Sequence, residues 1–188
     1  MIFFDTETTG VPRDYRAPVT DTANWPRIVQ ISWLVVSDDR RIIRQEDHVI
    51  RPVGFVIPAE ASAIHGITQE KALRVGEDLR EVMARFSEDV RNDSCVVGHN
   101  VSFDINVSKC EYVRMGVPDP FAGKAVKCTM QSSTDYCRIP GYYGYKWPRL
   151  DELYVKLFGR HFEDAHNSLA DIKATYECFW KMRDMGLI

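Results

Sequence analysis

The sequence predicts an α/β fold, on three observations. Apolar and β-branched runs typical of strands occupy much of residues 2–50. Apolar positions at helical spacing follow over 77–91, directly before a short apolar run at 95–98, which is the helix-to-strand order of an α/β unit. Helical patterns dominate after residue 130. With 188 residues and 45% apolar content the chain can bury one core, so we expect a single domain over residues 1–188.

Each element rests on a local pattern. The opening apolar run and the β-branched run RIVQISWLVV predict two strands, and a polar turn at 37–40 joins the second to a hairpin partner. Two shorter apolar runs complete the expected strands: 2–5, 27–36, 41–50, 95–98 and 125–129. Helical spacing predicts helices at 77–91, 103–115, 130–137, 149–158 and 167–184. Glycines stand where helices are expected to stop, at Gly116, Gly159 and Gly186.

Composition excludes several classes of protein. The formal net charge of −3 argues against a protein that coats duplex nucleic acid by bulk electrostatics, although a local basic surface remains compatible with it. The five cysteines are odd in number and lack Cys-x-x-Cys spacing, so reduced thiols in a cytoplasmic protein are expected rather than disulfides or a zinc knuckle. No apolar run approaches the roughly 20 residues of a membrane span, and the start MIFFDTE lacks the features of a signal peptide. We therefore expect a soluble, unexported protein with no membrane partner.

The most informative motif is Asp-Thr-Glu-Thr-Thr-Gly at residues 5–10. Side chains alternate across a strand, so Asp5 and Glu7 must share one face, where their charges repel. A divalent metal ion would compensate this repulsion. Gly10 and Pro12 end the strand in a turn, which leaves the pair accessible to a ligand. The alternative is an ordinary strand end with two solvated acids.

A second group lies where the expected strand at 95–98 gives way to a helix. Asn100 or Ser102 can cap this helix, and Asp104 then lies in its first turn, where the helix dipole favours a carboxylate. That is already an adequate structural explanation of Asp104. Its place at the carboxyl end of a strand also suits a third acid of a ligand site.

A third group, His166-Asn167-Ser168-Leu169-Ala170-Asp171, opens the last expected helix, which Asn167 or Ser168 caps. Histidine can take a proton from water near neutral pH, and Asp171 offers a hard oxygen ligand for Mg²⁺ or Mn²⁺. A surface histidine and a helix-dipole aspartate are the alternative. His161 and His166 lack the spacing of a helical zinc site, so zinc is disfavoured.

Together, Asp5-x-Glu7, Asn100-x-x-Phe103-Asp104 and His166-x4-Asp171 resemble the three motifs of the DEDD exonucleases, in the subgroup with a catalytic histidine (DEDDh). The resemblance covers nearly the whole chain. The protein is similar to the DnaQ-like proofreading subunit epsilon of DNA polymerase III and to the Trex-type exonucleases. It implies an RNase H-like fold, with a five-stranded mixed β-sheet flanked by α-helices and the second strand antiparallel to the rest.

The resemblance also implies an activity and a cofactor. The expected reaction is 3′-5′ exonuclease hydrolysis of phosphodiester bonds at single-stranded or frayed DNA ends, releasing nucleoside 5′-monophosphates with two divalent metal ions, Mg²⁺ or Mn²⁺. By similarity, Asp5 bridges both metals, Glu7 and Asp171 complete the site that binds the attacking water, and Asp104 serves the second metal. His166 is the implied general base.

Substrate recognition has weaker signals. Residues that match family substrate contacts are Thr8, Thr9, His65, Asn100 and Phe103, although His65 and Phe103 also suit a core. The segment 138–149 interleaves three tyrosines and a tryptophan with basic residues, which is typical of a strand-binding loop. The alternative is a surface loop that folds its aromatic rings onto the domain. The long connection at 13–25 is either a lid or an insertion.

Other functions remain open at this stage. A 3′-5′ exoribonuclease acting on RNA ends or short oligoribonucleotides differs by contacts to the 2′-hydroxyl, which the sequence does not disclose. A catalytically silent nucleic-acid-binding module would be expected to lack one of the acids. A subunit that works with a DNA polymerase or a replication or repair partner would be expected to carry an extra C-terminal segment, whereas the chain ends at Ile188.

Overall fold

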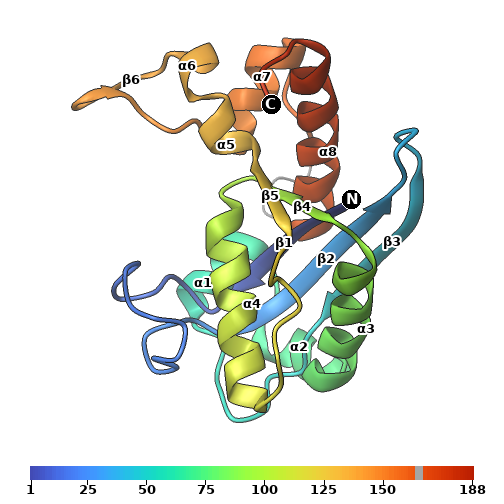
Figure 1. Ribbon diagram of the computed structural model, residues 1–188. Helices are drawn as coiled ribbons and strands as arrows, with labels where there is room; N and C mark the ends of the chain where they lie inside the picture. The colour runs from blue at the N-terminus through green and yellow to red at the C-terminus, as the bar shows by residue number, and fades with distance from the viewer. Residues whose placement is uncertain (164–166) are drawn as a thin grey trace.

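A five-stranded mixed β-sheet forms the centre of the molecule (Figure 1). The computed structural model describes residues 1–163 and 167–188. The strands are β1 (Ile2–Thr8), β2 (Ile28–Val36), β3 (Ile42–Val49), β4 (Cys95–Gly98) and β5 (Ala125–Cys128), in the spatial order β3-β2-β1-β4-β5. β2 pairs antiparallel with both β1 and β3, while β4 pairs parallel with β1 and β5. The second strand is therefore antiparallel to the rest, and the expected fold class is confirmed.

Helices cover both faces of this sheet. They are α1 (Ala59–His65), α2 (Gln69–Val75), α3 (Leu79–Asn92), α4 (Val101–Met115), α5 (Thr129–Ser132), α6 (Thr134–Cys137), α7 (Leu150–Phe158) and α8 (Ser168–Asp184). α3 and α4 share one core cluster with the sheet, whereas α8 packs on β1 and β2 in another. A small hairpin, β6 (Pro140–Gly141) and β7 (Gly144–Tyr145), extends outward beside α5 and α6 (Figure 1).

The alternation of β1 sorts its side chains between the two faces. Phe4 packs in the cluster under α3 and α4, and its neighbour Phe3 packs in the cluster under α8. Because the alternation continues along the strand, Asp5 and Glu7 lie on the α8 face and Thr6 on the α4 face. The strand itself runs three residues beyond the predicted range 2–5, since its pairing with β2 continues to Thr8.

The junction between β4 and α4 is tightly packed. A Cβ on Gly98 would lie 2.9 Å from Val101 Cβ and 3.2 Å from the Phe4 carbonyl oxygen, so the close approach of the helix to β1 requires glycine. Asn100 takes the cap position with a φ of 63°. Its side chain makes no capping hydrogen bond with the described residues, and Ser102 lies inside the helix, so the predicted side-chain cap is wrong. At α8, the cap is confirmed, because Asn167 accepts from the Leu169 and Ala170 amides.

Several local predictions needed correction. The helix expected over 130–137 is divided into α5 and α6 at Ser133, and α4 begins at Val101 rather than 103. The helices α1 and α2 were not predicted. They have seven residues each. α1 has Pro58 at its cap position and no side-chain cap among the described residues, so its start carries little signal, whereas Thr68 caps α2 by accepting from the Lys71 amide.

The structure also describes the two loops for which the sequence left alternatives open, 138–149 and 13–25. Tyr142 and Tyr143 at the hairpin tip are 91% and 97% exposed, so the alternative in which that loop folds its aromatic rings onto the domain is wrong for them. The connection at 13–25 is anchored through Trp25, which is buried in the core cluster of α3 and α4.

In the part of the chain that the structure describes, no helix combines the length and apolar character needed to cross a membrane. That residues 1–188 form one independent domain stays a prediction.

Candidate active site

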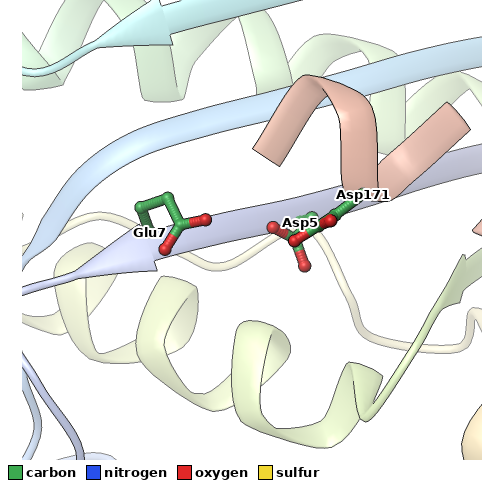
Figure 2. Close-up of side chains that lie close together, drawn as sticks. All are labelled: Asp5, Glu7 and Asp171. Carbon is green, nitrogen blue, oxygen red and sulfur yellow. The ribbon is translucent and has the colours of Figure 1, made fainter. Parts of the chain in front are cut away.

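Three carboxylates converge beside β1. One oxygen each from Asp5, Glu7 and Asp171 lie within 4.8 Å of one another. Figure 2 shows Asp5 and Glu7 on the same strand, with Asp171 reaching them from the start of α8. The sequence predicted that these residues share a site, and the structure brings them together.

A chain of hydroxyl contacts places α8 over Asp5. Ser32 lies opposite Asp5 in the register of β1 and β2, and its hydroxyl contacts the hydroxyl of fully buried Ser168 in the first turn of α8. Ser32 also donates to Asp47 Oδ1 at 2.7 Å. Because a serine hydroxyl has a single hydrogen, Ser168 must be the donor to Ser32. This bond fixes the start of α8 one turn before Asp171.

Asp104 reaches the same strand from the opposite side. It is buried in the first turn of α4, and its Oδ1 accepts from the Thr6 amide at 3.0 Å and the Thr6 hydroxyl at 2.7 Å. Thr6 stands between Asp5 and Glu7 but faces α4. Asp104 is therefore outside the group of three carboxylates within 4.8 Å, with one oxygen bound to Thr6.

The carboxylates share strong electrostatic strain. Burial raises the pKa of Asp5 well above its ordinary value, and the charges of Asp104, Asp171 and Glu7 raise it further. Burial, followed by the charges of Asp171 and Asp104, raises the pKa of Glu7 to about 8. Burial raises the pKa of Asp104 to about 7 despite the opposing hydrogen bonds from Thr6. A bound cation would relieve this strain by favouring the ionised forms.

The donors in this group fit a hard divalent cation. Asp5, Glu7 and Asp171 offer carboxylate oxygens, the ligand type that Mg²⁺ and Mn²⁺ prefer. Three half-buried acids within one small volume would also be costly without a compensating charge. Donor chemistry and electrostatics thus agree with the predicted cofactor class.

Three predicted substrate contacts lie beside the end of β1. Thr8 donates its hydroxyl to the Gly10 carbonyl at 2.6 Å. The Thr9 hydroxyl accepts from the Arg27 amide at 3.0 Å, so both threonines stabilise the strand end. His65, buried at the end of α1, has its pKa lowered chiefly by burial, against a smaller opposing effect of the Thr8 backbone. The structure therefore gathers these three residues next to Glu7.

The other two predicted contacts, Asn100 and Phe103, line a cavity of about 480 Å³ at the first turn of α4. Phe103 is half-buried and also packs against the core cluster, which agrees with the structural role that the sequence left open. His166, the predicted general base, lies outside the described residues.

Sequence reasoning missed Thr6 and Ser32. Thr6 lies between Asp5 and Glu7 in the sequence. Alternation along β1 places its side chain on the face opposite to theirs, where the first turn of α4 contacts it. Ser32 is a hydroxyl within the apolar run of β2, and a polar group in a buried strand signals a hydrogen-bond partner. Its partner could not be read locally, because Ser168 is 136 residues away.

Known proteins share both the sequence pattern and this fold. The RNase_T family, described as exonuclease, matches residues 2–179. The PolC-type DNA polymerase III of Pediococcus pentosaceus is 28% identical over 184 residues, which are 97% of this chain but 11% of that protein. The DNA polymerase III subunit epsilon-like protein of Rhodobacter capsulatus is also 28% identical, over 97% of this chain and 23% of that protein. The chain thus spans less than a quarter of these two relatives.

Among solved structures, E. coli exonuclease I in complex with a dT13 oligonucleotide has a TM-score of 0.76 and 23% identity, covering 99% of this chain and 42% of that one. This likeness agrees with the sheet order and helix arrangement described above. The family match extends from the first residue of β1 into α8 and includes the strand and helix that carry the three converging carboxylates. The chain therefore belongs to the RNase_T family of exonucleases, phosphodiester hydrolases of the DnaQ-like 3′-5′ type.

Proposed function

We propose that this chain is a metal-dependent 3′-5′ exonuclease that shortens single-stranded or frayed DNA ends and releases nucleoside 5′-monophosphates. The observation that carries the proposal is the convergence of Asp5, Glu7 and Asp171 within 4.8 Å, in a chain of an exonuclease family. Their raised carboxyl pKa values support a site built for cations. A silent binding module would not need to retain this strained group.

The three converging carboxylates would hold the metal ions, and Asp104 would contribute the oxygen that Thr6 does not bind. Two divalent cations about 3.5–4 Å apart would supply activation of a water molecule and stabilisation of the charge on the leaving oxygen. The zinc ion bound form of E. coli exonuclease I with single-stranded DNA supports a divalent cation in this fold. The carboxylate donors favour Mg²⁺ or Mn²⁺ here.

Different residues of the chain have different roles in the proposed reaction. β1 and the anchored start of α8 hold Asp5 and Asp171 in fixed positions, so the site requires little rearrangement. His166 would take the proton from water as its oxygen attacks phosphorus. The bond from phosphorus to the 3′ oxygen of the preceding nucleotide breaks, and that oxygen takes up a proton from solvent water. The products are a 3′-hydroxyl on the shortened strand and a nucleoside 5′-monophosphate.

Substrate contacts follow from the site's surroundings. Thr8, Thr9 and His65 stand beside Glu7, where the terminal nucleotide would lie, and Asn100 and Phe103 line the adjoining cavity. The similar structures include exonuclease I with dT13 and dA16 oligonucleotides, which supports DNA as the substrate. Polymerase-type relatives support a replication partner, which co-purification with a DNA polymerase would test.

Digestion of 5′-labelled DNA and RNA oligonucleotides of one sequence tests the proposed function. Each is incubated with Mg²⁺, Mn²⁺ or EDTA, using wild type, Asp5→Ala and the exposed control Glu88→Gln. We expect metal-dependent ladders shortened from the 3′ end with wild type and Glu88→Gln, faster on DNA, and none with Asp5→Ala. Intact DNA with every metal would overturn the proposal, and faster shortening of RNA would replace DNA as the substrate.

A further inference from the structure

The cavity at the first turn of α4 is bordered by aromatic side chains from distant parts of the chain. Tyr15 comes from the segment between β1 and β2, Phe103 from α4 and Trp147 from the segment after β7. Met130 on α5 adds a further apolar group, and the polar groups include the amides of Asn100 and Asn106. The cavity has a volume of about 480 Å³, and none of the described residues that line it carries a charge. An uncharged aromatic cavity suits a nucleobase better than a phosphate group.

Two of these aromatic residues keep much of their surface open to solvent. Tyr15 is 59% exposed and Trp147 is 61% exposed. The three other tryptophans, at 25, 33 and 180, are at most 6% exposed. Aromatic rings left open beside a cavity offer flat faces on which a base can stack.

The segment that carries Tyr15 is held in place. Asn24 is buried and braces the residue before Tyr15, because its Oδ1 accepts from the Asp14 amide at 2.8 Å and its Nδ2 donates to the Asp14 carbonyl at 2.9 Å. Trp25, also buried, donates its indole N–H to the Pro18 carbonyl at 3.2 Å. Tyr15 therefore stands on a fixed loop, which reduces the entropy lost when a ligand binds.

The neighbours of Trp147 are fixed on both sides. Lys146 forms an ion pair with Glu152, with N–O distances of 2.7 and 2.8 Å, and its amide donates to the Ile139 carbonyl at 2.9 Å. The Pro148 carbonyl accepts from His99 Nε2 at 3.0 Å. Trp147 is thus exposed between two anchored residues, an arrangement suited to a preformed contact.

We propose that Tyr15 and Trp147 stack against bases of the single strand upstream of the scissile bond and hold it in the cavity. The inference rests on the proposed function. The first turn of α4 carries both Phe103, which lines the cavity, and Asp104, which is proposed to serve the metal ions. Bases in a duplex are paired and stacked on each other, so this subsite selects unpaired ends. Stacking also accepts every base, which gives binding without sequence preference.

Binding is measured in the Asp5→Ala background, in which the oligonucleotide is not consumed. Fluorescence anisotropy with labelled oligothymidylate compares Tyr15→Ala and Trp147→Ala with Ile43→Ala, a residue of β3 that is 67% exposed and does not line the cavity. We expect a loss of affinity of roughly 5- to 100-fold for each of the first two variants. The control should change affinity less than about twofold, since it removes an exposed apolar side chain outside the subsite.

Tryptophan fluorescence provides an independent readout of the contact. Trp25 also lines the cavity but is 4% exposed, so quenching by unlabelled oligothymidylate should come chiefly from Trp147 and be largely lost in Trp147→Phe. Undiminished quenching in that variant, or affinities in Tyr15→Ala and Trp147→Ala equal to those of the control, would overturn the subsite.

A minimal substrate separates this inference from the proposed function. The p-nitrophenyl ester of thymidine 5′-monophosphate has no upstream base, so Tyr15→Ala and Trp147→Ala with Asp5 intact should hydrolyse it at the wild-type rate while KM for oligothymidylate rises. Equal losses on both substrates would overturn an upstream role. If wild type hydrolyses neither substrate, the proposed function fails, and the binding measurements still decide whether the subsite exists.

Discussion

Glu7→Gln should stabilise the metal-free protein at alkaline pH while it removes exonuclease activity. The Glu7 carboxyl has its pKa raised from 4.5 to about 8, chiefly by burial and then by the charges of Asp171 and Asp104. Between these values the folded state retains a proton that the unfolded state has lost. The stability that protonated Glu7 contributes at low pH is therefore lost as pH rises from about 4.5 towards 8, because the unfolded state binds fewer protons than the folded state over this range.

The size of the effect follows from the shift. One pKa unit corresponds to about 1.4 kcal/mol, so the full shift of Glu7 gives roughly 5 kcal/mol as an upper bound. Glu7 is only half-buried, and solvent screens part of the interaction, so we expect about 2 kcal/mol. Glutamine has a similar shape without the charge. At high pH the free energy of unfolding of the variant should therefore exceed that of wild type by this amount.

Urea unfolding in EDTA at pH 5 and pH 8.5 measures the effect in wild type, Glu7→Gln and the exposed control Glu88→Gln. The gain of Glu7→Gln over wild type should be large at pH 8.5 and small at pH 5, whereas Glu88→Gln should follow wild type at both. Adding Mn²⁺ should stabilise wild type more than Glu7→Gln. A wild type as stable as Glu7→Gln at pH 8.5 in EDTA would refute the claim that these acids strain the folded state.

Three further predictions concern the frame around the site. Ser168→Ala removes the hydroxyl contact with Ser32 and should cost about 1 kcal/mol in urea unfolding and lower kcat several-fold, whereas an unchanged kcat would show that this bond does not position α8. Gly98→Ala should lower the free energy of unfolding by roughly 1–3 kcal/mol in thermal denaturation, because its Cβ would lie 2.9 Å from Val101 Cβ; wild-type stability would show that the junction relaxes freely. Burial lowers the pKa of His99 from 6.5 to about 4, so the unfolded state takes up its proton first and stability is lost as pH falls from about 6.5 towards 4. In urea unfolding, His99→Asn should gain about 2 kcal/mol relative to wild type between pH 7 and pH 5, and equal pH slopes for the two proteins would contradict this assignment.

Much of the site could be predicted from the sequence because its signals are local. Alternation alone placed Asp5 and Glu7 on one face of β1, and the Asn167 cap signal located the start of α8 and hence Asp171. The confirmed antiparallel second strand came instead from the resemblance to a family, since no local pattern specifies strand order. Local periodicity and family likeness thus supplied different parts of the prediction.

The parts that failed depend on contacts between distant residues. The bond between Thr6 and Asp104 spans 98 positions, and the contact between Ser32 and Ser168 spans 136. Neither pairing has a signal within a short window. Asn100 takes the predicted cap position of α4, but its side chain makes no capping hydrogen bond with the described residues, because the backbone there adopts a left-handed conformation at a tightly packed junction.

The central claim is that Asp5, Glu7 and Asp171 hold divalent cations on which catalysis depends. Calorimetric titration of Mn²⁺ into metal-free wild type and Asp171→Asn, with 3′-end shortening of DNA measured at the same Mn²⁺ concentrations, tests it most directly. The account predicts that wild type binds Mn²⁺ over the concentration range in which activity rises, and that Asp171→Asn loses both. Undiminished binding and cleavage in Asp171→Asn, or cleavage by wild type that EDTA does not stop, would contradict it.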